Sequence, residues 1–187
     1  MSALYYCRQT TTACKGIPYP SKIHPYKYGT SGCVYTSGCG VCASLMALRN
    51  STTRVFNTRQ WTHRCLGMGA RAAEGTDMAV VARYMKEKYG LDYAITTDMD
   101  RLVAHLKQGY KAIINVSGGG KMLFSNSGHY VLAAGIDKNG NLIILDPYWY
   151  DGKFTLTAAR RKYTRVKNGR EVYVRPADLK GDVLSLW

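Results

Sequence analysis

The hydrophobic pattern of this 187-residue chain changes its period once, close to residue 110. Before that point apolar residues recur at helical spacing, and after it they form short, strand-like blocks. The links between these blocks carry Asn139-Gly140 and Asn168-Gly169, dipeptides that favour tight hairpin turns. Helices followed by hairpins predict an α+β fold, with N-terminal helices packed on a C-terminal antiparallel β-sheet.

Capping residues and apolar runs delimit the individual elements. Thr76 or Asp77 can cap one helix, which Gly90 ends, and the sequence 97–100 is similar to a capping box that opens another. The expected helices cover residues 39–49, 58–65, 77–89 and 97–108, and the expected strands cover 111–117, 129–137, 141–146, 163–166 and 171–174.

The length of the chain fits a single domain over 1–187. Residues 1–36 are rich in Tyr, Thr, Gly and Pro and are expected to form an extended N-terminal arm and loops. Residues 39–108 are expected to be mainly helical and 111–187 mainly β. No stretch approaches the ~20 apolar residues of a membrane span. The N-terminus lacks the features of a signal peptide, so we expect synthesis in the cytoplasm.

The formal net charge is +14, from 26 basic and 12 acidic residues. Such a balance implies an anionic partner, which can be nucleic acid, a membrane surface or an acidic polymer such as a bacterial wall. The chain shows no nucleic-acid-binding signature, so no specific nucleic acid is expected. Residues 160–170 contain no acid, and two interpretations stay open: a solvated loop or edge strand, or a binding patch. The basic residues there are Arg160, Arg161, Lys162, Arg165, Lys167 and Arg170.

Cys39 lies in the run Ser-Gly-Cys-Gly-Val-Cys-Ala-Ser-Leu-Met-Ala-Leu, a glycine-hinged loop that leads directly into an apolar helix. The first N–H groups of a helix are unpaired, and the helix dipole is positive at that end. Both effects lower the pKa of a thiol, and the thiolate is the attacking form. The same N–H groups can hold the oxyanion of an acyl intermediate, so Cys39 is a candidate nucleophile.

His129 begins an expected strand and Asp146 ends the strand paired with it. With Cys39 they supply a nucleophile, a general base and acid, and a carboxylate that orients the imidazole. If Asn139-Gly140 turns the hairpin in strict register, Asp146 faces Ala133, four residues from His129. A bulge or an offset strand is therefore required. The other histidines, His24, His63 and His105, are expected to be structural or solvated.

The six cysteines show no paired Cys-x-x-Cys spacing with a second pair downstream, so the chain predicts no zinc site. Cys7 and Cys14 could pair, but a cytosolic origin favours free thiols. Cys42 is a rival nucleophile, three residues after Cys39. We favour Cys39 because it stands at the start of the helix. Cys42 lies further into the helix, at a position where a small buried residue is expected.

Several blocks of the chain resemble papain-like cysteine peptidases of the bacteriocin-leader-processing type. The chain is more closely similar to their stand-alone branch, common in bacterial cell-wall-associated and phage lytic proteins. The resemblance covers about residues 25–150. The blocks that carry it are Tyr28-Gly29-Thr30, Ser37-Gly38-Cys39-Gly40, Leu45–Leu48, Gly75-Thr76, Leu106–Val116, Gly128–Leu132, Asp137–Asn141 and Leu145-Asp146-Pro147.

The resemblance implies a papain-like α+β fold with Cys39 as nucleophile, His129 as base and acid and Asp146 as orienting residue, with no metal and no cofactor. The chain departs from the family pattern at two positions. Val41 stands where the family often has Pro, and Cys33 stands where leader-processing members have a Gln that donates to the oxyanion. The backbone N–H of Cys39 is then the first candidate donor, with Thr36 or Ser37 as local helpers.

The sequence therefore predicts a cysteine peptidase or amidase that cleaves peptide bonds of bacterial peptidoglycan, like a phage endolysin. We expect it to act as a monomer at the cell wall after release, on an anionic wall polymer or a peptidoglycan peptide. The alternatives are a protease for protein or leader-peptide substrates, and a polyanion-binding module on a degenerate peptidase fold. The aromatic run Tyr148-Trp149-Tyr150 either lines the substrate cleft or packs in the core.

Overall fold

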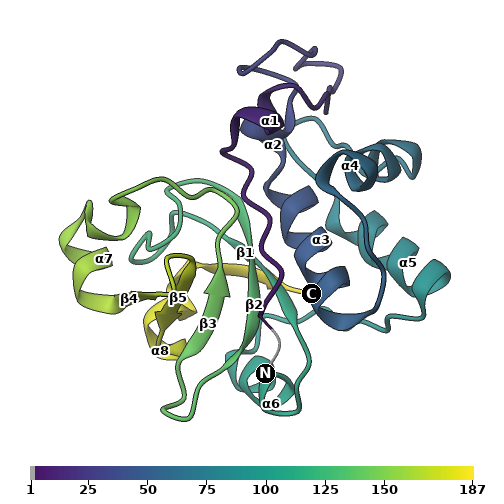
Figure 1. Ribbon diagram of the computed structural model, residues 1–187. Helices are drawn as coiled ribbons and strands as arrows, with labels where there is room; N and C mark the ends of the chain where they lie inside the picture. Colours follow the sequence, from purple (N-terminus) through teal and green to yellow (C-terminus); the bar gives the residue numbers. More distant parts are fainter. Residues whose placement is uncertain (1–2) are drawn as a thin grey trace.

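The computed structural model describes residues 3–187 and shows a helical half beside a sheet half (Figure 1). The helical half contains α3 (Cys39–Ser51), α4 (Thr58–Gly67) and α5 (Met78–Tyr89). A further helix, α6 (Met99–Lys107), packs against the sheet. This arrangement of helices and sheet confirms the predicted α+β class.

Six strands form one sheet in the order β4-β5-β3-β2-β1-β6, and every neighbouring pair is antiparallel. Five of them lie within a residue or two of the predicted strands. The sixth, β6, was not predicted, because four residues at the end of the chain show no clear alternation. The strands are β1 (Ala112–Val116), β2 (His129–Ile136), β3 (Leu142–Leu145), β4 (Thr164–Lys167), β5 (Glu171–Val174) and β6 (Val183–Leu186).

Helix α3 lies between the other helices and the sheet, and it is buried on all sides from Gly40 to Leu48. Its nearly continuous apolar sequence is the pattern of a helix enclosed on every side. It lies in the hydrophobic cluster between the helices and β2, while a second cluster fills the opposite face of the sheet under α6. Among residues 3–187, no helix combines the length and the apolar character that crossing a membrane requires.

Side-chain caps fix where the helices begin. Asp77, and not Thr76, caps α5, and Gly90 ends that helix in the left-handed conformation with φ of 69°. The predicted start of α6 is wrong by one position. Asp98 is its N-cap, and its carboxylate accepts the N–H groups of Asp100 and Arg101. Asp is favoured at an N-cap because its carboxylate satisfies exposed donors of the first turn.

Several short elements were not predicted, because three to six residues are too few for a periodic pattern. Two one-turn helices lie inside the segment that was expected to be an arm and loops, and the remainder lie near the C-terminus. They are α1 (Thr12–Lys15), α2 (Val34–Ser37), η1 (Lys153–Thr155), α7 (Ala158–Tyr163), α8 (Pro176–Leu179) and η2 (Lys180–Asp182).

The first residues of the described chain do form an extended arm, which crosses the molecule between the helical and the sheet halves (Figure 1). Polar contacts hold it to both sides. The Tyr5 N–H donates to Asn50 of α3, while the Tyr6 hydroxyl donates to the carbonyl of Asp146 over 2.7 Å. Further along, the Gln9 N–H donates to the carbonyl of Pro147 over 2.9 Å. The arm therefore runs beside the segment that follows β3.

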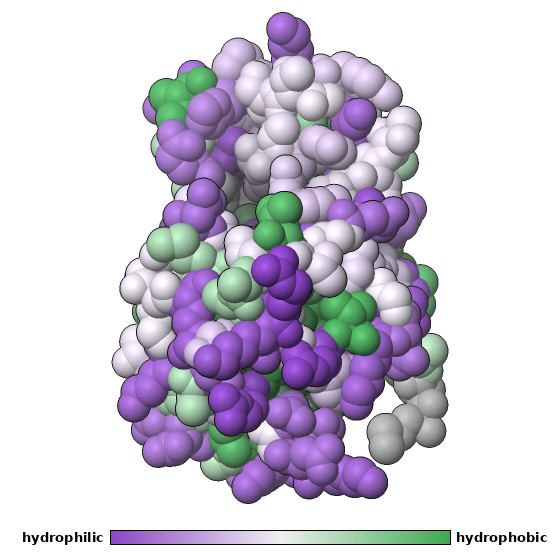
Figure 2. Space-filling view, turned by 90° about the vertical axis from the view of Figure 1, so that its left-hand side faces the viewer, coloured by the Kyte–Doolittle hydropathy of each residue, from purple (hydrophilic) through white to green (hydrophobic). Residues whose placement is uncertain are grey.

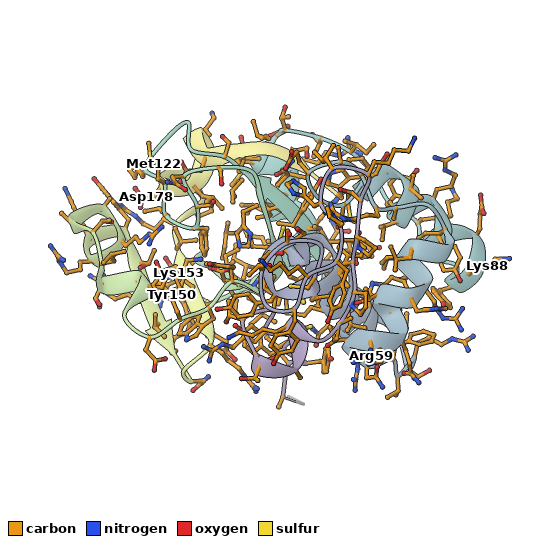
Figure 3. All side chains as sticks on the ribbon, turned by 90° about the horizontal axis from the view of Figure 1, so that it is seen from above. Arg59, Lys88, Met122, Tyr150, Lys153 and Asp178 are labelled. Carbon is orange, nitrogen blue, oxygen red and sulfur yellow. The ribbon has the colours of Figure 1, made fainter. Side chains whose placement is uncertain are left out.

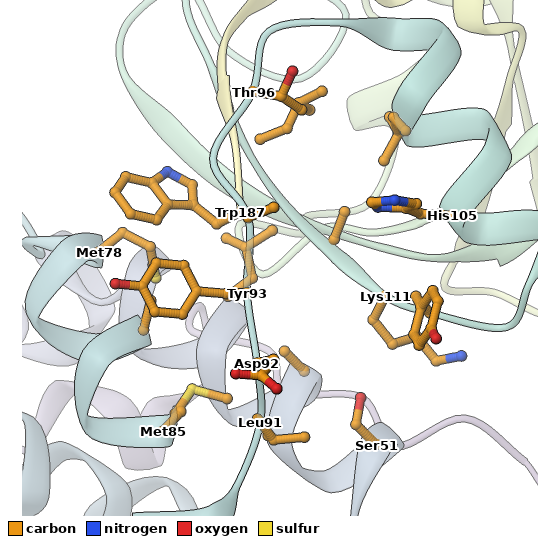
Figure 4. A pocket seen from close by; sticks show the side chains of 18 of the residues that line it. Ser51, Met78, Met85, Leu91, Asp92, Tyr93, Thr96, His105, Lys111 and Trp187 are labelled. Carbon is orange, nitrogen blue, oxygen red and sulfur yellow. The ribbon is translucent and has the colours of Figure 1, made fainter. Parts of the chain in front are cut away.

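A cavity of about 680 Å³ opens at the C-terminal end of α3 (Figure 4). Its walls are mainly apolar and include Met78, Met85 and Trp187. Ala47 also lines it, and eight residues of α3 separate Ala47 from Cys39. At 1.5 Å per residue this distance is about 12 Å along the helix, so the cavity is separate from the site described next.

Candidate active site

Cys39 is the first residue of α3, where a single residue separates this helix from α2. That residue is Gly38, and a Cβ at this position would lie 2.5 Å from the carbonyl oxygen and Cγ1 of Val34. The close approach of the two helices therefore requires glycine. The Cys39 thiol is half-buried. Its backbone N–H has no acceptor among residues 3–187, as expected in the first turn of a helix.

Gly40 allows the start of α3 to pack tightly against the segment before α5. A Cβ on Gly40 would lie 2.5 Å from the Cβ of Thr76, and Thr76 is held by a 2.9 Å hydrogen bond with the Tyr19 hydroxyl. We expect Gly40→Ala to lower the free energy of unfolding by about 1–3 kcal/mol, as overpacking commonly does. Denaturant unfolding measures this loss.

Gly67→Ala is the matched control for that change. Gly67 is also helical, but a Cβ there meets nothing within 4 Å. Since Ala is the better helix former by up to about 1 kcal/mol, this variant should be neutral or more stable. Equal free energies of unfolding for the two variants would show that the contact between Gly40 and Thr76 is not tight.

The sheet brings His129 and Asp146 together. His129 Nε2 lies 2.8 Å from Asp146 Oδ1, and both side chains are buried. For this contact the sequence required a bulge or an offset strand, and the pairing of β2 with β3 does shift at a bulge between Ala133 and Gly135. Leu145 pairs with Leu132, so the position after it lies opposite Val131, two residues from His129. Such diagonal neighbours on one face of a sheet are within reach of each other.

The Cys39 thiol and the same imidazole are close enough to shift each other's pKa. Because Nε2 faces Asp146, the nitrogen that remains for the thiol is Nδ1. Burial raises the pKa of Cys39, but the hydrogen bond and charge of His129 outweigh it, so the pKa lies below its ordinary value. The nearby backbone N–H groups of Tyr130 and Gly40 also lower its pKa.

Burial alone would lower the pKa of His129, but the charge and hydrogen bond of Asp146 raise it to about 9. Burial opposes ionisation of Asp146 as well, yet the charges of His129 and Lys153 hold its pKa below the ordinary value. These shifts favour a thiolate paired with an imidazolium, and an ionised carboxylate beside them. This is the charge arrangement that a cysteine nucleophile requires.

Lys153 is a member of this site that the sequence analysis missed. Its side chain is 2% exposed, and Nζ donates to Asp146 Oδ2 over 2.5 Å and to the Tyr148 carbonyl over 2.8 Å. The Tyr148 N–H donates to Asp146 Oδ1 over 2.9 Å. With His129, three donors thus fix both oxygens of the carboxylate. A lysine in a polar stretch gives no sequence signal of such burial.

Cys42 lies one turn further along α3 and is fully buried. Its contact with Cys7 and its burial raise its pKa well above the ordinary value. A buried neutral thiol is a poor nucleophile, so the geometry favours Cys39. All six cysteines are free in the structure.

Gln9 is a second residue that the sequence analysis missed. It is 1% exposed and lies between the segments that carry Cys39 and Asp146. Its Nε2 donates to the carbonyl of Tyr35 over 3.1 Å. In a continuous helix this carbonyl would accept the N–H of Cys39, four residues later. The Gln9 amide therefore contacts α2 four residues before Cys39. Of the helpers expected locally, Thr36 instead donates its hydroxyl to the Cys33 carbonyl over 3.2 Å.

Aromatic side chains line one side of the site. The ring of Tyr148 meets the imidazole of His129 edge-on, with centroids 6.4 Å apart, and Tyr150 lies next to Tyr148. Both tyrosines are more than one-third exposed, whereas Trp149 packs on Phe154 in the core. Figure 3 shows Tyr150 and Lys153 together on the sheet side of the molecule. The aromatic run thus divides between the surface beside His129 and the core.

The remaining histidines do not join the site. His24 pairs with Glu74 on the surface, His105 lines the cavity at the far end of α3, and His63 is exposed on α4. Within residues 3–187, no group of three or more His, Cys, Asp or Glu side chains is arranged to hold a metal ion.

Comparison with known proteins gives one match to a family. The profile of the Peptidase_C39 like family matches residues 14–171, which include Cys39, His129, Asp146 and Lys153. A search of curated proteins gives no match.

Proposed function

Since the chain belongs to the Peptidase_C39 like family of papain-like cysteine peptidases, we propose that Cys39, His129 and Asp146 are its catalytic residues. The observation that supports this assignment is their geometry. The thiol and the carboxylate both act on one buried imidazole, with Nε2 held 2.8 Å from Asp146. Cys39 and His129 also shift each other's pKa, the thiol's downward and the imidazole's upward.

In the proposed reaction the Cys39 thiolate attacks the carbonyl carbon of a peptide bond, and the carbonyl oxygen becomes an oxyanion. The His129 imidazolium then donates its Nδ1 proton to the leaving amine as the C–N bond breaks, which leaves a thioester on Cys39. Neutral His129 next takes a proton from water, and the hydroxide hydrolyses the thioester. Asp146 keeps the imidazole oriented, and Lys153 keeps Asp146 ionised and in place.

The oxyanion is proposed to lie between the free N–H of Cys39 and the amide of Gln9. One Nε2 proton of Gln9 is engaged by Tyr35, and the other is available to a ligand. Gln9 would thus supply the side-chain donor to the oxyanion that leader-processing peptidases have at the position of Cys33. Donors of this kind act where charge develops in the transition state.

Gln9→Ala is therefore expected to lower kcat by about 100- to 1,000-fold, the usual effect of losing one oxyanion donor. KM should change little, because the ground-state carbonyl carries less charge. Gln108→Ala, at the exposed C-cap of α6, is the control and should retain full activity. Steady-state kinetics on a cleavable peptide, with thermal unfolding to verify the fold, decides the matter. A Gln9→Ala enzyme that folds normally and keeps its kcat would remove Gln9 from the mechanism.

The pH dependence of kcat/KM follows from the thiolate–imidazolium pair. Activity should rise as Cys39 deprotonates, at a pH below the ordinary thiol value of about 8.5. It should fall as His129 loses its proton at a pH of about 9, because the neutral imidazole cannot protonate the leaving amine. A bell-shaped profile is the expected result. If kcat/KM continues to rise above a pH of about 9, the reaction does not depend on a thiolate–imidazolium pair.

We further propose that the substrate is the peptide portion of bacterial cell-wall peptidoglycan, and that the enzyme acts there after release, like a phage endolysin. The net charge of +14 supports an anionic target. The exposed rings of Tyr148 and Tyr150 beside His129 also offer flat surfaces on which sugar or peptide groups can pack.

The test is digestion of purified peptidoglycan and of intact susceptible cells by the wild type and by Cys39→Ala. Falling turbidity and new peptide amino termini, both absent from the variant, are the expected results. The alternative, a protease for protein or leader-peptide substrates, would be favoured if no wall releases peptides while a polypeptide library is cleaved in a Cys39-dependent way.

A further inference from the structure

A polar groove of about 390 Å³ lies on the sheet half, between the turn that joins β2 to β3 and the edge strand β4. His129 begins β2, and the groove begins just past its other end. At about 3.3 Å per residue, β2 places the groove roughly 25 Å from the catalytic histidine. The groove is lined by Asp137, Asn139, Asn141, Lys162, Tyr163, Arg165, Lys167, Tyr173, Arg175 and Asp178.

Four exposed cations line this groove, and three of them have no carboxylate partner. Arg175 is paired with Asp178 over 2.6 Å, whereas Lys162, Arg165 and Lys167 form no ion pair within residues 3–187. The groove contains two carboxylates, so its lining carries a net charge of +2, four cations minus two anions. Figure 2 faces this side of the molecule, and hydrophilic side chains cover much of its lower part.

Arg165 is already positioned for a ligand. Its Nη1 donates to the carbonyls of Arg161 over 3.0 Å and Thr164 over 2.8 Å, which anchors the guanidinium at the end of α7. Nε and Nη2 have no partner among residues 3–187. Together they form the fork of two donors that binds phosphate in a bidentate manner. Because the side chain is held before binding, little conformational freedom is lost.

The aromatic rings of the groove are covered by ammonium groups. Lys167 Nζ lies 4.1 Å from the centroid of Tyr173, and Lys121 and Lys162 lie 4.9 and 5.1 Å from that of Tyr163. Rings covered in this way do not provide the open stacking platforms that bind single-stranded nucleic acid. The carboxylate of Asp137 would also oppose the dense charge of a duplex.

The opposite wall offers hydrogen-bonding groups. Asp137 accepts the N–H groups of Asn139 and Asn141 and the side-chain amide of Asn141. These hydrogen bonds and the charge of Lys167 lower its pKa, so the carboxylate is ionised near neutral pH. Together with the amide oxygens of Asn139 and Asn141, it can accept from hydroxyl groups. The groove thus combines cations for phosphates with acceptors for a polyol.

We propose that this groove binds a polyol-phosphate polymer and thereby holds the enzyme on cell walls that carry one. The inference rests on the proposed function, because a wall peptidase works on a surface where such polymers are attached. A second point of attachment some 25 Å from Cys39 raises the local concentration of the active site at the wall without any new contact to the scissile peptide.

The test compares two triple variants with the same change in charge. Lys162→Gln/Arg165→Gln/Lys167→Gln removes the unpaired cations of the groove. Arg59→Gln/Arg83→Gln/Lys88→Gln removes three exposed cations from α4 and α5, on the opposite side of the molecule (Figure 3). Affinity for purified, lipid-free poly(glycerol phosphate) is measured by calorimetry at fixed salt. The groove variant should bind about 10- to 100-fold more weakly than the wild type, and the control variant about as well as the wild type.

Enzyme assays then separate the inference from the proposed function. Both triple variants should cleave peptidoglycan stripped of its polymer at the wild-type rate, and the groove variant alone should act slowly on intact walls. Equal polymer affinities for the two variants would overturn the inference, even if the wall is cleaved. Tighter groove-dependent binding of duplex DNA than of the polymer would also overturn it. Failure to cleave any wall, with groove-dependent polymer binding intact, would overturn only the peptidoglycan assignment.

Discussion

Replacing Cys39 by Ala is expected to reduce peptide hydrolysis by about 10⁴-fold or more, the scale on which loss of a covalent nucleophile acts. The fold should survive, because Cys39 is half-buried and begins α3 without packing in the core. His129 would retain Asp146 but have no thiol to activate. Hydrolysis of a peptide substrate, measured with circular dichroism of the same sample, tests both statements.

Cys42→Ala is the matched control, three residues away on the same helix. Its sulfur is fully buried, so its loss should leave a small cavity and cost about 1–2 kcal/mol of stability. Activity should stay within a few-fold of the wild type. If Cys39→Ala stays active, or if a folded Cys42→Ala protein is inactive, the nucleophile is misassigned.

Breaking the buried ion pair between Lys153 and Asp146 is expected to have the largest effect on stability. Both side chains are almost completely buried, and Nζ lies 2.5 Å from Oδ2. Lys153→Met leaves the carboxylate without its second cation, and Asp146→Asn leaves a buried ammonium without an anion. Each single change should cost about 3–5 kcal/mol, as is typical when one partner of a buried pair is removed.

The double variant gives the sharper result. Asp146→Asn/Lys153→Met removes both charges and should be more stable than the sum of the single losses predicts, since the two sites are in contact. Lys121→Met is the control, because Lys121 is one-third exposed, lies 3.6 Å from Asp178 and should contribute about 1 kcal/mol or less. If Lys153→Met and Lys121→Met lower the free energy of unfolding by similar amounts, the buried pair does not stabilise the site.

The fold class could be predicted, and the candidate residues Cys39, His129 and Asp146 could be proposed, where the signal is local. Asn139-Gly140 indicated the β2–β3 hairpin, and the apolar run after Cys39 indicated a buried helix. His129 and Asp146 were chosen because the chemistry of a thiol nucleophile requires their residue types beside paired strands. These are patterns of neighbouring residues, which a single sequence displays.

What the sequence could not predict depends on packing between distant segments. Gln9 reaches the Cys39 region because the arm crosses the molecule, thirty residues before the nucleophile. Lys153 is buried because Asp146 attracts it, although most lysines are exposed. The bulge that the sequence analysis required in the hairpin could not be located in advance, since its position near Ala134 is not marked by any turn residue.

The basic stretch 160–170 also contains a residue whose burial depends on packing between distant segments. Both interpretations of it assumed that its side chains face solvent. The structure agrees with an edge strand for β4, but Arg160 is buried, and its guanidinium donates to the carbonyls of Lys153 and Met122. The exposed cations that this stretch supplies to the polar groove all follow Arg160; they are Lys162, Arg165 and Lys167.

Alkylation of the native protein by iodoacetamide, with the labelled cysteines identified by mass spectrometry, tests the central assignment most directly. The activated thiolate predicts that Cys39 reacts first, at a pH below the ordinary thiol pKa of about 8.5, and that activity disappears in step with its labelling. His129→Ala should shift this reaction to higher pH. Labelling of Cys42 before Cys39, or full activity after Cys39 is alkylated, would contradict the account.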